Sequence, residues 1–194
     1  MKKLFSILLI ALLFAFSTQA IGETTPLAVN QEALDDYGYL SPIREAKDCT
    51  RKEPLTQFQT VHFVLDGVDV YMKPHRCGSG DWANSIMKNS ITDGSPSGDW
   101  YVIRFRIMTV DNGTDTEIDI SSYDFSVYDA NWSEVDKAIS VGLDDSFSGF
   151  PGSFGRFSFA DNAPKGEIRY VRFCPNELVN KDEQINLWIA PMSE

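Results

Sequence analysis

The sequence is poor in cysteine, histidine and positive charge, and no long apolar run follows its first twenty residues. Its 194 residues include 3 Cys and 2 His, and 17 Lys and Arg are outnumbered by 28 Asp and Glu, for a net charge of −11. An acidic surplus disfavours nucleic acid and anionic membrane surfaces as partners, because both repel an acidic chain. We therefore expect no nucleic-acid partner.

The apolar run at the start has the organisation of a signal peptide. Two lysines precede Leu4–Phe16, and Ser17–Ala20 supplies the small residues that a signal peptidase requires. The run is short for a membrane span, which needs about 20 apolar residues. We expect cleavage after Ala20 and a secreted or periplasmic protein with no span in the mature chain. Cleavage removes two lysines and no acid, so the mature net charge is −13.

A central stretch from Tyr101 to Val110 alternates with a period of two, as a β-strand does. One face is apolar and consists of Tyr101, Ile103, Phe105 and Ile107. The other face carries two arginines between two apolar residues, Val102, Arg104, Arg106 and Met108. We expect the first face to lie in a core and the second to be mostly in solvent. Asp111-Asn112-Gly113 then predicts a turn.

Further strands are predicted on both sides of this stretch. Gln57–Leu65 and Val68–Lys73 flank Asp66-Gly67, which is typical of a β-hairpin. The other expected strands are Thr116–Ile120, Tyr123–Tyr128, Phe154–Phe159, Glu167–Phe173 and Ile185–Ile189. Short helices are expected at Trp82–Lys88 and Ser133–Ala138.

Seven to eight short strands separated by turns indicate an all-β protein, an antiparallel β-sandwich of immunoglobulin-like type. The length fits one domain, which we place at residues 56–194. Residues 21–55 show weak periodicity and are expected to form an extended N-terminal arm.

The order of features from Trp100 to Phe173 suggests a family. A long strand ends in an Asn-centred turn, and a strand pair, a Pro-Gly turn, a Gly-x-x-x-Phe strand and a closing strand follow. The matching residues are Val102–Asn112, Phe125–Asp129, Pro151-Gly152, Gly155–Phe159 and Ile168–Phe173. This order resembles the immunoglobulin-like domain of small secreted bacterial proteins of the telokin-like, immunoprotective extracellular type. The resemblance implies a fold far more than a function, since many such domains have no assigned activity.

The three cysteines lie in the exported part, where disulfide bonds form and persist. Three is an odd number, so at most one intramolecular bond forms. We predict a Cys49–Cys77 bond, which brackets the hairpin, with Cys77–Cys174 as the alternative. Cys174 is then the remaining thiol, either buried or available for an intermolecular bond.

Motifs for metal or cofactor chemistry are weak. His75 and Cys77 supply two ligands, but no third follows at a suitable spacing. Asp111–Asp119 is acidic but lacks the glycine and glutamate positions of an EF-hand loop. Ser85-x-x-Lys88 lacks the partner motifs of penicillin-recognising enzymes. We predict no metal, cofactor or catalytic residue.

The function predicted from sequence is non-catalytic binding or interaction, with a protein or a glycan as partner. Trp82 and Trp132 lie in polar, loop-like surroundings, so we expect them near a binding surface. One alternative is a carbohydrate-binding module that uses these tryptophans. Another is a hydrolase that acts through Asp144, Asp145 and an acid from another loop. The sequence does not indicate an oligomeric state.

Overall fold

The computed structural model describes residues 43–90, 100–135, 146–161, 168–175 and 184–191, all of which lie in one compact unit, Glu32–Glu194. The predicted signal peptide and most of the predicted arm lie outside these residues. Within them, no helix is long and apolar enough to cross a membrane.

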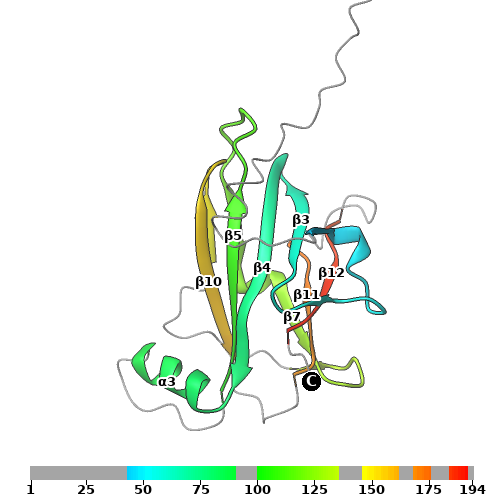
Figure 1. Cartoon of the computed structure of the whole chain (residues 1–194), viewed down its shortest axis with the longest axis vertical. Helices are drawn as coiled ribbons and strands as arrows, with labels where there is room; N and C mark the ends of the chain where they lie inside the picture. Colours follow the sequence, from blue (N-terminus) through cyan, green and yellow to red (C-terminus); the bar gives the residue numbers. More distant parts are fainter. Residues whose placement is uncertain (1–42, 91–99, 136–145, 162–167, 176–183, 192–194) are drawn as a thin grey trace, which may run out of the picture. The chain divides into compact units, whose positions relative to one another are not determined.

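The larger layer, sheet A, has five strands, and four of them run side by side in Figure 1. Its order is β1 (Ile43–Glu45), β3 (Thr60–Leu65), β4 (Val68–Ser79), β5 (Tyr101–Thr109) and β10 (Phe154–Asp161). The pairing is antiparallel except between β1 and β3.

The second layer, sheet B, also has five strands. Its order is β2 (Leu55–Thr56), β12 (Leu187–Ala190), β11 (Tyr170–Phe173), β7 (Phe125–Tyr128) and β8 (Glu134–Val135). Only β2 pairs in parallel, with β12. A separate two-stranded ribbon joins β6 (Ile118–Ser121) to β9 (Ser146–Gly149). The all-β sandwich predicted from the sequence is confirmed.

The β3–β4 hairpin forms where the sequence predicts it. Asp66 and Gly67 both have positive φ, 50° and 82°, and Val64 pairs with Asp69 across the turn. Positive φ at both central residues is the conformation of a type I′ turn, whose twist matches that of the flanking strands. Asp-Gly is therefore the local cause of this register.

Strand β5 lies between β4 and β10 in sheet A, and the core face predicted for it is confirmed. Its four apolar residues at odd positions are at most 4% exposed. The prediction for the other face is wrong in part, because Val102 and Met108 are buried as well. A helix, α3 (Asp81–Ser90), contributes Ala83 and Met87 to a small cluster that covers Val102.

Five phenylalanine rings connect the two sheets through the core. Phe105 stacks on Phe157 at a centroid distance of 5.1 Å and contacts Phe125 of sheet B at 5.0 Å. Phe125 contacts Phe173 at 4.7 Å, and Phe173 returns to Phe63 of sheet A at 5.3 Å. Burial of aromatic area is a major source of stability in such a core.

Part of the predicted arm belongs to the sandwich. β1, the 3-10 helix η1 (Ala46–Asp48) and β2 all lie before residue 57, and β1 and β2 extend one edge of each sheet. Twelve strands are therefore described, more than the seven or eight expected. Three of the four strands that were not expected, β1, β2 and β8, have only two or three residues, which is too short to show a period of two. The fourth is β9.

One local prediction differs from the structure. Glu134–Val135, expected in a short helix, forms strand β8, whereas residues 136–138 lie outside the described part. Of the two strands expected after β5, β6 pairs with β9, and β7 joins sheet B after a 3-10 turn, η2 (Ser122–Asp124). The helix expected at Trp82–Lys88 is confirmed as part of α3.

Candidate functional site

The outer face of sheet A gathers basic side chains from three adjacent strands. Lys73 on β4 pairs with Arg106 on β5, and Arg106 pairs with Arg156 on β10. Directly paired residues point to the same face of a sheet. This face is the outer one, because the neighbouring Phe105 and Phe157 point into the core.

A second basic row lies next to the first. Arg76 pairs with Arg104, and Arg104 pairs with Ser158, whose hydroxyl accepts a hydrogen bond from Arg104 Nε at 3.1 Å. The two rows are two residues apart on β5, which corresponds to about 7 Å along the strand. We call the five residues of both rows the cationic band: Lys73, Arg76, Arg104, Arg106 and Arg156.

Exposure increases across the first row of the band. Lys73 is only 4% exposed, Arg106 is half-buried, and Arg156 is exposed. Burial, together with the charge of Arg106, lowers the pKa of Lys73 below its usual range. The band therefore combines a desolvated charge at its base with a guanidinium group that reaches solvent.

A histidine lies at an irregularity in β4 beside the band. The register shifts between Pro74 and Arg76, and His75 Nε2 accepts a hydrogen bond from Arg106 Nη2 at 3.2 Å. Burial lowers the pKa of His75, and so do four neighbouring cations. In order of decreasing effect these are Arg106, Lys73, Arg156 and Arg104. The field at His75 from these four groups is positive.

The band has apolar boundaries along the strands. Beyond the second row, Val102 and Ala160 pack against α3. Beyond the first row, Tyr71, Met108 and Phe154 form the next row of paired residues, in which Phe154 is 56% exposed. The band is thus limited to two rows of the sheet.

An acidic group borders the band at the Tyr71 row. Glu45 and His62 belong to this row, because Glu45 pairs with His62 and His62 pairs with Tyr71. His62 bridges two carboxylates: its Nδ1 is 3.0 Å from Glu45 Oε2, and its Nε2 is 2.8 Å from Asp69 Oδ1. A protonated imidazole donates to both carboxylates, whereas a neutral one donates to only one. Both acids therefore have a partner in His62.

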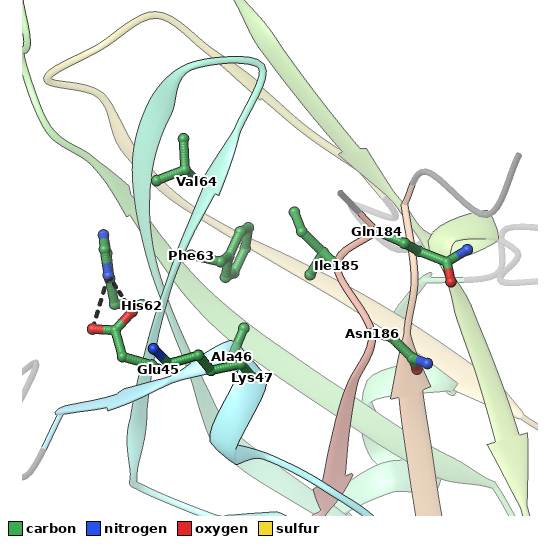
Figure 2. A pocket seen from close by; sticks show the side chains of 9 residues that line it. All are labelled: Glu45, Ala46, Lys47, His62, Phe63, Val64, Gln184, Ile185 and Asn186. Carbon is green, nitrogen blue, oxygen red and sulfur yellow. Dashed lines mark hydrogen bonds and ion pairs between the residues drawn. The ribbon is translucent and has the colours of Figure 1, made fainter. Parts of the chain in front are cut away.

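A small pocket lies beside this histidine (Figure 2). It has a volume of about 250 Å³ and is lined by residues of β1, η1, β3 and the segment before β12. In Figure 2, Phe63 and Ile185 point toward each other, whereas His62 is turned toward Glu45. The pocket is smaller than the 300–1,000 Å³ or so typical of ligand sites.

One exposed aromatic side chain adjoins the band. Phe58 is 57% exposed, and its ring centroid lies 6.4 Å from that of His75 in an edge-on arrangement. Its backbone N–H donates to the carbonyl of Pro74 at 2.9 Å, which fixes it beside the irregularity of β4. An apolar surface is therefore available next to the charged groups.

Trp132 does not project freely into solvent. It stacks on Tyr170 with a centroid distance of 3.7 Å and an interplanar angle of 8°, and it meets Trp188 edge-on at 5.2 Å. Arg51 lies over both indoles, 5.3 Å from Trp132 and 4.5 Å from Trp188. These contacts cover the outer face of sheet B, so Trp132 packs within the fold.

Trp82 is also packed. It lies in the first turn of α3, contacts the cluster of Ala83 and Met87, and carries the Arg76 guanidinium 4.4 Å from its ring centroid. Trp82 therefore lies in the helix that the sequence predicts, and a cation–π contact holds Arg76 over its ring.

The predicted Cys49–Cys77 disulfide bond is not formed. Cys49 lies after η1, where its carbonyl accepts from the Trp188 N–H, whereas Cys77 pairs with Ile103 in the middle of sheet A. Cys174 follows β11 and is not disulfide-bonded either. Burial raises the pKa of Cys49 to about 11 and that of Cys77 to about 12.

The remaining candidates for catalysis or metal binding are Asp144, Asp145 and the acidic segment that begins at Asp111. Asp144 and Asp145, proposed for a hydrolase, lie outside them. Within the described part, no group of three or more His, Cys, Asp or Glu side chains is placed to hold a metal ion. Asp111 instead accepts from the Gly113 N–H within its own loop, and Asn112 donates to the Gly67 carbonyl in the turn between β3 and β4.

The sequence pattern missed the cationic band. Arg104 and Arg106 are visible as two arginines on one face of a predicted strand, and this was the only local signal. Lys73 and Arg156 join them through strand register, which the sequence does not reveal. The structure thus defines a two-sheet all-β sandwich with a band of cations on one outer face.

No family model matches the chain, and no curated protein matches it in sequence. Two solved structures show similarity. The secreted protein MPT63 of Mycobacterium tuberculosis aligns with a TM-score of 0.47 and 12% identity, over 71% of this chain and 98% of that protein. The ycdA protein of Bacillus subtilis subsp. subtilis str. 168 aligns with a TM-score of 0.36 and 13% identity, over 64% of this chain and 37% of that protein.

Proposed function

We propose that the chain is an exported, non-catalytic binding protein that holds an anionic ligand on the outer face of sheet A. Export follows from the signal peptide expected at residues 1–20, with the periplasm or the cell exterior as destination. The site is the cationic band.

The observation that carries this proposal is the direct pairing of like charges. Lys73, Arg106 and Arg156 occupy neighbouring positions on three strands. The band is a concentration of positive charge on a chain that is acidic as a whole. Its exposed members, Arg76 and Arg156, support a binding role, because guanidinium groups form strong paired hydrogen bonds to carboxylate and phosphate.

An anion is favoured over a neutral sugar. A sugar stacks on an open aromatic face, but Trp132 is covered by Tyr170 and Arg51, and Trp82 is covered by Arg76. The carbohydrate module and the hydrolase remain alternatives that the same experiment addresses.

The test is a titration of the mature, isotope-labelled protein followed by amide NMR at low ionic strength. The probes are sulfate, citrate, an alkanediol bisphosphate and a neutral oligosaccharide. Shifts that saturate for at least one anion and map to β4, β5 and β10 support the proposal. Shifts on sheet B with the oligosaccharide alone, or no saturating shift with any anion, overturn it.

The matched variants are Arg156→Gln and Lys52→Gln. Both residues are exposed and each substitution removes one positive charge, but Lys52 lies in the loop between η1 and β2, away from the band. We expect Arg156→Gln to weaken anion binding about tenfold, as the loss of a charge-assisted hydrogen bond does. Lys52→Gln should leave it unchanged. Equal weakening by both would indicate an effect of net charge alone.

A further inference from the structure

We infer that the pocket beside His62 is a second ligand site, and that it takes a free α-amino acid with a branched aliphatic side chain. None of its lining residues belongs to the cationic band, so this site goes beyond the anion binding proposed above. The supporting observations are the apolar part of the lining, the volume of the pocket, the uncovered edge of β3, and charges of both signs at the rim.

The buried part of the lining is apolar and comes from both sheets. Phe63 of β3 is 4% exposed and Ile185, shortly before β12, is 9% exposed, and Figure 2 shows their side chains pointing toward each other. Ala46 of η1 and Val64 of β3 complete the apolar lining. An aliphatic side chain placed here would lose contact with water, which favours binding.

The volume of the pocket, about 250 Å³, limits the size of the ligand. A water molecule takes up about 30 Å³ in the liquid, so this volume corresponds to about eight units of that size. Valine and leucine have about this many non-hydrogen atoms. Tryptophan or a peptide of several residues exceeds it.

Strand β3 presents an uncovered edge at the pocket. In the described part of the chain, β1 pairs with β3 from Thr60 to His62, and Val64 lies beyond this pairing. Asp69, the β4 partner of Val64, directs its carbonyl away from β3 to the Val110 N–H at 3.0 Å. Opposed residues of an antiparallel pair either bond to each other or direct their backbone groups outward, so the Val64 N–H and C=O point to the open edge.

The backbone groups of Val64 suit the two ends of an α-amino acid. An N–H donates to a carboxylate, and a C=O accepts from an ammonium group. In an α-amino acid these two groups are attached to one carbon atom, as the N–H and C=O of a strand residue are. The ligand would thus add to the edge of β3 as a single residue, in the way that an extended peptide adds to a sheet edge.

Charges of both signs stand at the rim of the pocket. Lys47 is exposed and has no ion-pair partner among the described residues. Both carboxylate oxygens of Glu45 lie near His62 Nδ1, at 3.1 and 3.0 Å, and each oxygen has a further acceptor site. A zwitterion matches this rim, with its carboxylate toward Lys47 and its ammonium toward Glu45, whereas a peptide terminus carries only one of these charges.

The test compares affinities by isothermal titration calorimetry on the dialysed mature protein. The probes are leucine, leucinamide without the carboxylate, 4-methylpentanoate without the ammonium, alanine without the branched side chain, and tryptophan as a larger side chain. We expect leucine to bind at least about tenfold more tightly than each of the others, because each of them loses one of the contacts above or exceeds the volume.

Lys47→Gln and Lys52→Gln are the matched variants. Both lysines are exposed and each substitution removes one positive charge, but Lys52 does not line the pocket. Lys47→Gln should weaken leucine binding about tenfold and leave that of leucinamide unchanged, whereas Lys52→Gln should change neither. Ala46→Leu, which fills the pocket, should abolish leucine binding. The urea midpoint of each variant is measured alongside, and if Ala46→Leu fails to fold, Lys47→Gln at its exposed position still decides.

The contrary outcomes are specific. Leucinamide or 4-methylpentanoate binding as tightly as leucine overturns the zwitterion, and alanine or tryptophan doing so overturns the branched aliphatic side chain. Equal weakening by Lys47→Gln and Lys52→Gln, or leucine binding retained in a folded Ala46→Leu variant, overturns the pocket as the site. An absence of saturable leucine binding overturns the inference as a whole. The anion site has its own titration, so either proposal fails independently of the other.

Discussion

At the scale of single residues, Phe105 connects the two layers of the sandwich. Its ring is fully buried between Phe157 of sheet A and Phe125 of sheet B. We predict that Phe105→Ala lowers the free energy of unfolding by about 3–5 kcal/mol, because truncation of a core phenylalanine loses burial and leaves a cavity. Urea unfolding measures this. Tyr123→Ala, at a side chain that is 86% exposed, is the control and should change stability by less than about 0.5 kcal/mol.

His75 should make stability depend on pH. Its pKa lies below 6.5 in the native protein because of burial and of the neighbouring cations. As the pH falls, His75 is therefore protonated at a higher pH in the unfolded chain than in the native protein. Stability contributed by neutral His75 is therefore present above about pH 6.5 and is lost as the pH falls below it. We predict that His75→Gln reduces the loss of stability between pH 7.5 and 5.5 in urea unfolding. An unchanged loss would contradict the lowered pKa.

The thiols of Cys49, which is buried, and Cys77, which is partly buried, should be unreactive in the native protein. The pKa values of Cys49 and Cys77, about 11 and about 12, leave almost no thiolate at pH 8, and the thiolate is the reactive form. We predict slow alkylation of both by iodoacetamide at pH 8 and rapid alkylation after unfolding in urea, followed by mass spectrometry. A Cys49–Cys77 linked peptide in a non-reduced digest of the exported protein would contradict the structure.

The local sequence pattern predicted which residues of β5 share a face. It did not predict that α3 packs on part of the outer face. The alternation from Tyr101 to Ile107 identifies the core face, because one strand alone determines which residues share a face. The burial of Val102 on the opposite face depends on α3, a helix that begins 21 positions earlier at Asp81. The alternation of residues within β5 does not show that a helix buries Val102.

At the scale of elements, strand β10 contains a glycine whose missing side chain is required. A Cβ atom at Gly155 would lie 2.7 and 2.8 Å from two ring carbons of Phe147, which is buried. We predict that Gly155→Ala lowers the free energy of unfolding by about 1–3 kcal/mol through overpacking. Gly78→Ala in β4 is the matched control. A Cβ atom at Gly78 would have no other atom within 4 Å, and Gly78 does not adopt a positive φ. Equal effects of both substitutions would rule out the steric explanation.

Strand pairings that depend on a local turn could be predicted from the sequence, whereas pairings between strands far apart in the chain could not. The β3–β4 hairpin was predictable because Asp66-Gly67 determines its register locally. The cationic band was not, because its first row unites Lys73, Arg106 and Arg156 through two longer-range pairings. The disulfide prediction used spacing along the chain, and spacing alone does not show whether two cysteines approach within bonding distance.

At the scale of the whole molecule, the export prediction has a direct test. We predict that the exported protein begins at Ile21, since Ser17–Ala20 has the small residues of a cleavage site. Intact mass and N-terminal sequencing of protein from the periplasm and the medium measure this. Ala20→Arg should block cleavage, and the uncleaved chain should remain with the membrane fraction. Recovery of the full chain in soluble form would contradict the prediction.

The pairing of β5 with β10 also has a consequence for the order in which the protein folds. The β3–β4 hairpin joins residues as close as Leu65 and Val68, whereas Arg106 and Arg156 are 50 positions apart in the chain. Closing the larger loop costs more entropy, and long-range strand pairing is slower than hairpin formation. The hairpin should therefore form early, and the cationic band should be completed late, when β10 joins the sheet. Until then the arginines of β5 lack Arg156 as a neighbour, so a partly folded chain should lack the complete site that we propose for an anion.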